Sequence, residues 1–398
     1  MFDGGGKIKT GSQQLIKETN IRRVFKHVSE HDGISRAELA NRIGLSPTTI
    51  SSLVEELISG GLVKEAGTGE IPTSGRKPIM LKVNPEGGCI ISSDLQENGY
   101  SIGIFDLNCI LINEEFIELQ DFSNLGNSLI KNVSRITKQN KYRIKDILGI
   151  CIGAPGIING TEGVIVSSTI LPIDSNNTFF RQLSKAYPDA KKEIVNESSL
   201  SAYTELQYGK STAGINNLIY IDIHTGIGAG IIINGRMYGG SGALAGEFGH
   251  ISVDLNGPLC KCGSRGCLET LASIPALIAN IEGDSGLPVE FTKAGTIDEK
   301  FQLIADEYKE NNGFSGEIKT MAKYIAYGIN NAVNLMNPGA VVIGGKAIEL
   351  GDKFLDEITN TMKKIGLDGN KETRILLSEY KGNPVTAGGA RHIFNIIF

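Results

Sequence analysis

The chain has 398 residues, 40% of them hydrophobic and 21% charged, which is enough for two or three domains with buried cores. It has no stretch of roughly 18 apolar residues and no basic-then-apolar N-terminal segment, so we expect a cytoplasmic protein that makes no membrane contact. The net charge of −5 is uneven, because residues 1–85 carry 12 Lys and Arg against 9 Asp and Glu, whereas the rest carries 27 against 35. This favours a polyanion-binding head on an acidic body, although so small an excess is also compatible with chance.

Three helices are expected in the head, and local capping signals set their ends. The first covers about residues 14–30, where apolar residues recur at helical spacing. The second begins with a capping box and ends at a glycine, and the third begins with a serine cap followed by proline. These start and stop residues are Ser35, Glu38 and Gly44 for the second helix, and Ser46, Pro47 and Gly60 for the third.

The short turn between the second and third helices is typical of a helix-turn-helix, in which the third helix reads the DNA. Its outward side chains are mostly short hydroxyls that can contact phosphates and base edges in a major groove, whereas a purely structural helix more often shows Glu and Lys there. DNA binding is therefore favoured, and a helical interaction module is the alternative. The predicted DNA-binding residues of this helix are Ser46, Pro47, Thr48, Thr49, Ser51 and Ser52.

A β-hairpin wing is expected after the third helix. Two short apolar stretches, residues 62–65 and 79–83, flank a turn-rich segment that holds Arg76 and Lys77. Cationic side chains at such a tip can reach the DNA backbone or the minor groove. We therefore predict a winged helix-turn-helix domain over residues 1–85 that binds double-stranded DNA.

The body, residues 86–398, alternates short apolar strands with helices and has glycine at the strand ends. Glycine accounts for 50 residues of the whole chain, well above its usual share of about 7%. This pattern predicts an α/β fold that places ligands at strand ends. The turn TGIGAG after residue 224 is by itself a weak signal for phosphate binding, because glycine hairpins are common. The expected strands are residues 89–93, 101–106, 110–116, 147–152, 193–195, 218–223, 231–233 and 341–343, and residues 318–336 form a long helix.

The strongest chemical signal is a set of metal-ligand side chains in one glycine-rich stretch. His250, Cys260, Cys262 and Cys267 have the spacing H-x9-C-x-C-x4-C, and three thiols with one imidazole suit a tetrahedral structural zinc with no open position. Disulfides are the alternative, which a reducing cytoplasm disfavours. The other cysteines lie in apolar runs and are expected to be ordinary buried residues: Cys89, Cys109 and Cys151.

Polar side chains around this stretch suit a polyol ligand. Glu247 precedes His250 by three residues, Glu269 follows Cys267 by two, and a separate Asn196-Glu197 pair follows an expected strand. Carboxylates accept hydrogen bonds from sugar hydroxyls, and an amide both donates and accepts, so together these groups can hold a monosaccharide. Any one of them alone would more often be a solvated surface residue.

These motifs resemble the ROK family of repressors, open reading frames and sugar kinases. Its signature is similar to TGIGAGIIINGRMYGGSGALAGEFGH followed by CKCGSRGCLE, and the head resembles the winged helix of the repressor branch, which includes xylose-type and N-acetylglucosamine-type repressors. The resemblance implies a two-lobed, actin-like sugar-kinase fold, with lobes at about residues 86–198 plus the C-terminal helix and 199–386. It also implies zinc at the four residues named above. The implied sugar-binding residues are Asn196, Glu197, Glu247, His250 and Glu269.

Three departures from the family's kinases predict a body that binds a sugar without phosphorylating it. The kinases have an Asp general base where this chain has Glu197, and a carboxylate displaced by roughly 1 Å can slow catalysis about 100-fold. Their first phosphate loop reads Asp-x-Gly-Gly-Thr, whereas residues 94–98 read DLQEN, so side chains fill the glycine positions and Glu97 opposes phosphate. His224 replaces the usual glycine before Thr-Gly-Ile-Gly. We therefore expect no catalytic residue and no bound ATP.

The combined prediction is a sugar-responsive transcriptional regulator, a repressor of carbohydrate-use genes that binds a pseudo-palindromic operator as a homodimer or homotetramer. A tenfold change in operator affinity would require about 1.4 kcal/mol of coupling to the sugar. One alternative is an ATP-dependent sugar kinase fused to a DNA-binding head. Another is a DNA-binding protein with no small-molecule ligand, which the polar cluster in the body disfavours.

Overall fold

The computed structural model describes residues 8–68, 77–283, 291, 293–370 and 372–398. The chain forms two compact units. The first unit comprises Met1–Ala154, Gly160–Ile194 and Gly389–Phe398, and the second comprises Pro155–Asn159 and Val195–Gly388. Within the described ranges, no helix is both long and apolar enough to cross a membrane.

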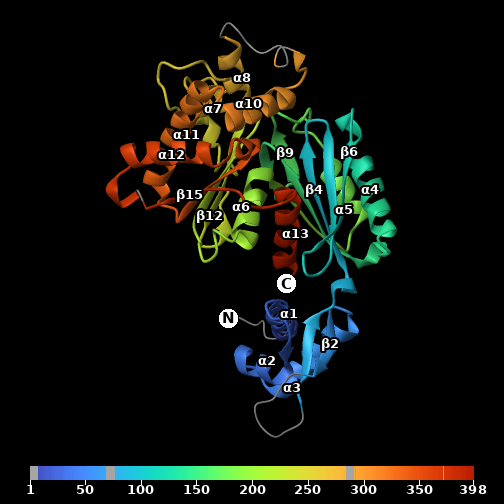
Figure 1. The fold of residues 1–398 in the computed structure, drawn as a ribbon. Coiled ribbons are helices and arrows are strands. Elements are labelled where there is room, and N and C mark those ends of the chain that lie inside the picture. The colour runs from blue at the N-terminus through green and yellow to red at the C-terminus, as the bar shows by residue number, and fades with distance from the viewer. Residues whose placement is uncertain (1–7, 69–76, 284–290, 292, 371) are drawn as a thin grey trace, which may run out of the picture. The chain divides into compact units, whose positions relative to one another are not determined.

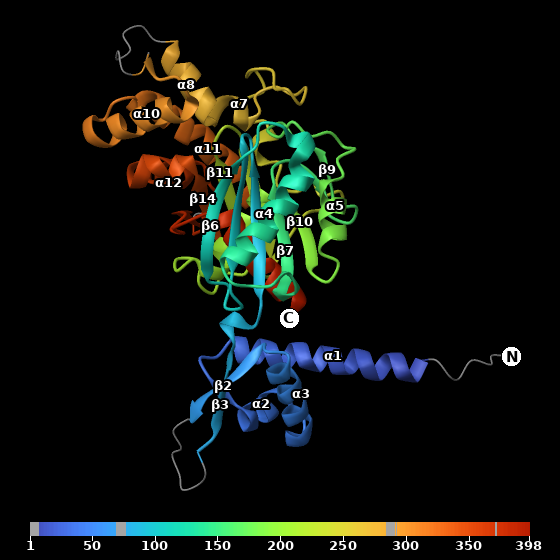
Figure 2. The ribbon, with the colours of Figure 1, turned by 90° about the vertical axis from the view of Figure 1, so that its right-hand side faces the viewer.

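The head is a winged helix-turn-helix at the start of the first unit. Three helices, α1 (Ile8–Ser29), α2 (Arg36–Ile43) and α3 (Pro47–Ser59), pack with a small sheet of strand order β1-β3-β2. Its strands are β1 (Ile34–Ser35), β2 (Val63–Thr68) and β3 (Ile79–Val83). α1 packs on α3 and β3, and Figure 2 shows its N-terminal part extending past the rest of the head.

Local chemistry explains the helix ends of the head. Ser35 accepts a hydrogen bond from the Glu38 backbone N–H, and the Glu38 side chain accepts one from Ser35, so the predicted capping box is confirmed. Gly44 ends α2 with a φ of +75°, a conformation that glycine adopts without strain. Two expectations differ from the structure, since α1 begins at Ile8 rather than near residue 14, and the two-residue strand β1 was not foreseen.

The rest of the first unit is built on a five-stranded sheet of order β10-β7-β4-β5-β6. β4 is parallel to β7 and antiparallel to β5. Two helices, α4 (Leu125–Gln139) and α5 (Phe179–Ala186), lie side by side against this sheet (Figure 1). The strands of this sheet are β4 (Cys89–Gln96), β5 (Gly99–Phe105), β6 (Leu111–Glu118), β7 (Ile147–Ala154) and β10 (Lys191–Asn196), and the short strand β9 (Val164–Ser167) lies outside it.

The second unit has its own five-stranded sheet of order β13-β12-β11-β14-β15. Among the described residues, α7, α8, α10, α11 and α12 cover one side of it and enclose a large apolar core that includes Phe301, Ile325 and Phe354, while α6 packs against β11 and β12. The strands of this sheet are β11 (Leu218–Ile223), β12 (Ile227–Ile233), β13 (Arg236–Met237), β14 (Ala340–Gly345) and β15 (Arg374–Leu377), and the short strand β8 (Ile157–Asn159) lies outside it. The helices are α6 (Glu197–Tyr208), α7 (Leu268–Ala272), α8 (Ile274–Glu282), α10 (Ile297–Asn311), α11 (Ser315–Met336) and α12 (Gly351–Ile365).

The α/β class is confirmed, but strand pairing changes two of the predicted loops. β4 continues to Gln96 and pairs with β5 as far as Gly99, so the expected loop over residues 94–98 shrinks to a turn at Glu97 and Asn98. β12 begins at Ile227, so most of TGIGAG is strand and the turn after β11 has only three residues. The last helix, α13 (Pro384–Ile397), begins in the second unit and ends in the first.

Candidate functional site

The recognition helix α3 presents the predicted hydroxyl side chains to solvent. Thr48, Thr49, Ser51 and Ser52 are all exposed, while the apolar stripe of the helix is buried. Ser46 has a structural task as well, because its hydroxyl accepts the Thr49 backbone N–H at 3.1 Å and so caps the helix. The exposed N-terminal turn of α3 is thus a rigid hydroxyl surface that can enter a major groove.

Arg36 holds the recognition helix to the wing, a role that the sequence did not reveal. Its guanidinium donates to Glu55 on α3 at 2.8 Å and to Glu65 on β2 at 3.0 Å. Glu55 lies two helical turns after Thr48, on the same side of α3. Arg36 therefore neutralises two carboxylates, one of them on the side of α3 that carries Thr48.

The wing is confirmed as a β-hairpin of β2 and β3, with a register shift between Glu65 and Thr68. Lys77 is exposed at the start of the returning strand. Arg76, the other predicted contact of the wing, lies outside the described residues.

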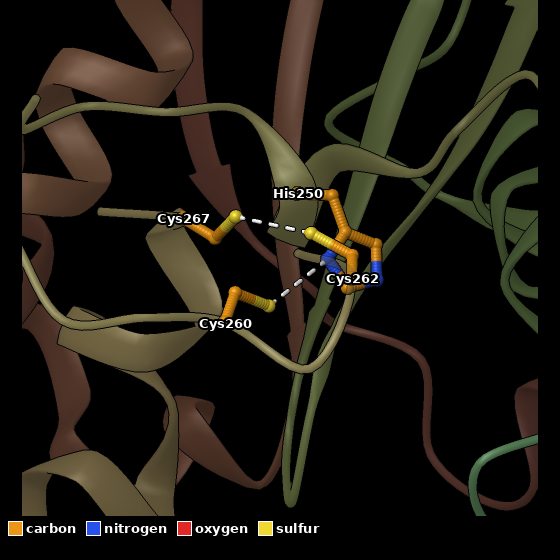
Figure 3. Close-up of side chains that lie close together, drawn as sticks. All are labelled: His250, Cys260, Cys262 and Cys267. Carbon is orange, nitrogen blue, oxygen red and sulfur yellow. Dashed lines mark hydrogen bonds between the residues drawn. The ribbon is translucent and has the colours of Figure 1, made fainter. Parts of the chain in front are cut away.

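The four predicted metal ligands lie together in the second unit (Figure 3). The ligand atoms of His250, Cys260, Cys262 and Cys267 are all within 4.8 Å of one another. His250 Nδ1 lies 3.6 Å from Cys260 Sγ, and Cys262 Sγ lies 3.6 Å from Cys267 Sγ. Two thiolates each about 2.3 Å from a tetrahedral zinc are separated by about 3.8 Å, so this cluster can hold zinc.

Two of the thiols in this cluster differ in their protonation chemistry. The backbone N–H of Ser264 stabilises the thiolate of Cys262 and lowers the pKa of that residue. Burial raises the pKa of Cys267 to about 12. A divalent ion supplies the positive charge that keeps a buried thiol ionised. By contrast, Cys89 is buried among apolar groups, and burial raises its pKa to about 12, as expected for an unreactive core thiol.

Two predicted sugar-binding carboxylates lie beside the cysteine–histidine cluster. The Nε2 atom of His250 is 3.9 Å from the Glu247 carboxylate, while Nδ1 of the same ring faces Cys260. A histidine that binds metal through one nitrogen can present the other to a carboxylate or a ligand. Both roles assigned to His250 are therefore geometrically compatible.

Glu269 connects the cluster to the glycine-rich hairpin. It lies in the first turn of α7, whose N-cap is Cys267, and its carboxylate accepts the Ile227 backbone N–H at 3.3 Å. A β-carbon at Gly226 would lie only 2.8 Å from this carboxylate, so the glycine permits the approach. Cys267 thus positions a predicted sugar-binding group through a single helical turn.

Asn196 and Glu197 lie at the end of β10 and the start of α6, a helix that packs on β12. Ser198 packs against Gly228 and Gly230, whereas the alternate residues of β12 face the apolar core beside Phe248. The Asn196 amide is partly engaged, because Oδ1 accepts the Ser199 N–H at 3.1 Å and Nδ2 donates to the Gly156 carbonyl at 3.2 Å. This anchoring fixes Asn196 while leaving one of its N–H groups to serve a ligand.

Residues 94–98 correspond to the first phosphate loop of the family's kinases, and side chains in this segment bond to one another. Gln96 Nε2 donates to the Asp94 carboxylate at 2.7 Å, and Asp94 is buried. Glycine at this position could not form that bond.

His224 lies in the turn between β11 and β12, where it meets charged groups from two other segments. Its Nε2 atom is 3.8 Å from Asp298 at the start of α10, and the same Asp298 carboxylate is 3.1 Å from the Lys346 ammonium. The Lys346 ammonium offsets the charge of the Asp298 carboxylate. No signal in the sequence joined these three residues, which lie far apart along the chain.

Comparison with known proteins agrees with the fold and the motifs. Residues 98–395 match the ROK family, and residues 17–64 match a winged helix-turn-helix DNA-binding family. The xylose repressor of Bacillus spizizenii is 31% identical over 349 residues, covering 87% of each chain. The N-acetylglucosamine repressor of Escherichia coli is 26% identical over 362 residues, covering 88% of this chain and 86% of the other.

Solved structures of similar fold include a regulator and a kinase. A ROK family transcriptional regulator, a homologue of the Escherichia coli MLC protein, superposes with a TM-score of 0.82 over 96% of both chains at 23% identity. A ROK family glucokinase from Streptomyces griseus superposes with a TM-score of 0.65 over 77% of this chain and 99% of its own, at 21% identity. The head and the metal-ligand cluster thus accompany an actin-like body, and the chain belongs to the ROK family.

Proposed function

We propose that this protein is a sugar-responsive transcriptional regulator whose winged head binds operator DNA and whose body senses a sugar without phosphorylating it. The proposal rests on two features that occur in one chain. The head has a recognition helix with exposed hydroxyl side chains, and the body has a polar cluster around Glu247, His250 and Glu269. We assign the head to residues 1–85 and the body to residues 86–398. The body lobes comprise residues 86–198 with the C-terminal helix, and residues 199–386.

The proposed DNA surface consists of the first turns of α3 and the wing. Short hydroxyls on α3 suit base edges and phosphates, and Lys77 with Arg76 supplies positive charge beside them. A pseudo-palindromic operator, bound by a homodimer or homotetramer, follows from the way helix-turn-helix proteins pair two recognition helices on one face of DNA. The proposed DNA-binding residues are Ser46, Pro47, Thr48, Thr49, Ser51, Ser52, Arg76 and Lys77.

The proposed sugar site uses Asn196, Glu197, Glu247, His250 and Glu269, with zinc as its structural support. Cys267 begins the helix that carries Glu269, and His250 faces both Cys260 and Glu247. Zinc at the cluster would therefore hold two of the sugar-binding carboxylates in place. Both xylose and N-acetylglucosamine are candidate effectors, because the two repressor relatives are named for them.

The absence of kinase activity is part of the proposal. Gln96 bonds to Asp94 where the family's kinases have glycine. A side chain in place of glycine disfavours the phosphates of ATP. Glu197 stands at the position of the kinase general base, with a longer side chain than Asp.

Fluorescence anisotropy on DNA upstream of the chain's own gene tests this function. The purified protein is titrated onto the DNA with xylose, N-acetylglucosamine, glucose or their phosphates present. We expect one sugar to change the operator affinity about tenfold, while coupled-enzyme assays detect no ADP. Consumption of ATP with a sugar and no DNA binding would instead establish the sugar-kinase alternative. DNA binding that no sugar changes would refute the sensor.

A further inference from the structure

The last helix, α13, touches both the scaffold of the predicted sugar site and the DNA-binding head. Its first residues belong to the second unit and its later residues to the first, with the division between Gly388 and Gly389. At each of these two positions a neighbouring segment comes so close to the backbone of α13 that only glycine fits. The helix thus has separate, tightly fitted contacts on either side of this pair.

The first turn of α13 is fitted against α6. A β-carbon on Gly388 would lie 2.1 Å from the Leu200 carbonyl oxygen, so the two helix backbones are in direct contact. The Thr204 hydroxyl also donates to the Pro384 carbonyl. Because α6 begins at Asn196 and Glu197, displacement of its N-terminus would be transmitted to the start of α13.

The later turns of α13 are fitted into the first unit. A β-carbon on Gly389 would lie 2.3 Å from the Ser92 hydroxyl on β4, and Ile393 reaches Gly149 on β7. Arg391 stacks on the Phe394 ring at 5.1 Å and hydrogen-bonds to Cys109, which fixes the rotation of the helix about its axis.

The end of this helix holds the head through three aromatic rings. Phe25 of α1 stacks on Phe398 with ring centroids 3.9 Å apart, and Phe394 lies 5.9 Å from Phe25 and 5.2 Å from Phe398. Phe25 is fully buried, and its helix neighbours Val24 and Val28 belong to the core of the head. Movement of these rings therefore reaches the residues on which the recognition helix packs.

We propose that α13 transmits the state of the sugar-binding body to the DNA-binding head, with Phe25, Phe394 and Phe398 as the clamp that delivers it. This inference rests on the proposed function for the sugar as the natural signal. The contacts themselves form a continuous chain from α6 through α13 to α1. Coupling between distant sites requires a structural element that has two alternative arrangements. Because α13 is tightly packed, we expect it to change from one arrangement to the other rather than to bend.

A double-mutant cycle on operator affinity tests the transmission without any sugar. Thr204→Val removes the hydroxyl that donates to Pro384, and Gly388→Ala forces α6 and α13 apart, so each perturbs the input end of α13. Phe398→Ala opens the clamp at the output end. We expect each input variant to change operator affinity at least about 5-fold, and less than about 2-fold when combined with Phe398→Ala. Two other results would overturn the proposal: equal changes in both backgrounds, or no change from either input variant.

Amide hydrogen exchange provides a second readout that does not involve DNA. Phe398→Ala should accelerate exchange in α1 around Phe25, because the clamp no longer protects that helix, while the central strands of the body stay protected. Tyr208→Ala is the matched control, since it removes a ring from the Tyr208–Tyr380 pair of the second unit, whose centroids are 5.9 Å apart. Unchanged exchange of α1 in Phe398→Ala would refute the clamp.

Titration with xylose and N-acetylglucosamine separates this inference from the proposed function. If a sugar changes the operator affinity of the wild-type protein, Phe398→Ala should bind the same sugar and the same DNA with the response reduced to within about 2-fold. A full response in that variant contradicts the transmission. If neither sugar acts on the wild-type protein, the proposed effector fails, and the double-mutant cycle still decides the role of α13.

Discussion

The head and the cysteine–histidine region of the body hold their functional side chains in opposite ways. In the head, Ser46 caps the helix that displays the hydroxyls by bonding to Thr49, three residues away. In the body, Ile227 bonds to Glu269 across 42 residues, and Asn196 bonds to Gly156 across 40. A surface built from local contacts can survive damage elsewhere, whereas a site built from distant segments depends on each of them. Each region should therefore lose its own binding when its own contacts are broken, so metal loss should disrupt the sugar site and leave the head folded.

The largest effect is expected from Cys262→Ser, which removes one ligand of the proposed zinc. Loss of a ligand should reduce metal affinity by about 100-fold or more, release α7 and its Glu269, and abolish the sugar response. Operator binding by the head should persist. Zinc content by mass spectrometry and anisotropy on DNA check this, with Lys261→Ser on the same loop as the control. A variant that retains both zinc and the sugar response would contradict the support role of the cluster.

The next largest effect is expected from Thr48→Asp on the recognition helix, which should weaken DNA binding and leave sugar binding intact. A carboxylate in the first turn of α3 favours the helix through its dipole, so the head stays folded, but it repels DNA phosphates and should weaken operator binding about 10- to 100-fold. Sugar binding, measured by calorimetry, should be unchanged. Thr320→Asp adds the same charge to an exposed position on α11 of the body and is the control. Equal losses in both variants would show a general charge effect rather than a DNA contact.

A smaller effect is expected from Arg36→Met. It tests whether DNA binding by the head depends on ion pairs between residues that are far apart in the sequence. This change leaves the carboxylates of Glu55 and Glu65 unpaired, and operator affinity should fall about 5-fold with a shallower dependence on salt, because salt screens the added repulsion. The unfolding free energy of the head should change by less than about 1 kcal/mol, because the pairs are partly exposed. Glu65→Gln in the Arg36→Met background should restore part of the affinity. Failure of that rescue would remove Arg36 from the DNA surface.

The smallest effect is a pH dependence of head stability through Glu38. The backbone N–H and hydroxyl of Ser35 lower the pKa of Glu38 in the folded head. Its contribution is therefore present above the unfolded pKa of about 4.3 and is lost as the pH falls through the lower, folded value. Thermal unfolding between about pH 6 and pH 3 should show a flatter acid dependence in Glu38→Gln than in wild type. An identical acid dependence in both proteins would rule out this contribution.

The contrast between local contacts and contacts across distant segments also explains how much could be predicted from sequence. The head was predictable almost throughout, because Ser35, Gly44 and Ser46 specify helix ends through partners within a few residues. The four metal ligands were predictable from spacing, because a short glycine-rich loop brings them together. Their roles in binding DNA, zinc and sugar stay predictions that the measurements above address.

The features that escaped prediction depend on distant partners. Gln96 became part of a strand because β5 pairs with it, and Arg36 found its carboxylates 19 and 29 residues away. Phe25 and Phe398 lie near opposite ends of the sequence, and no local pattern links them. Each is an ordinary core or surface residue until the fold brings its partner close.

The most direct test of the account is operator affinity measured with and without sugar on one preparation that contains stoichiometric zinc. If the protein is a sugar-responsive regulator, one sugar changes the operator affinity about tenfold without any phosphorylated product. Xylose and N-acetylglucosamine are the first to try. An operator affinity that stays constant across the whole panel of sugars and sugar phosphates would contradict the account.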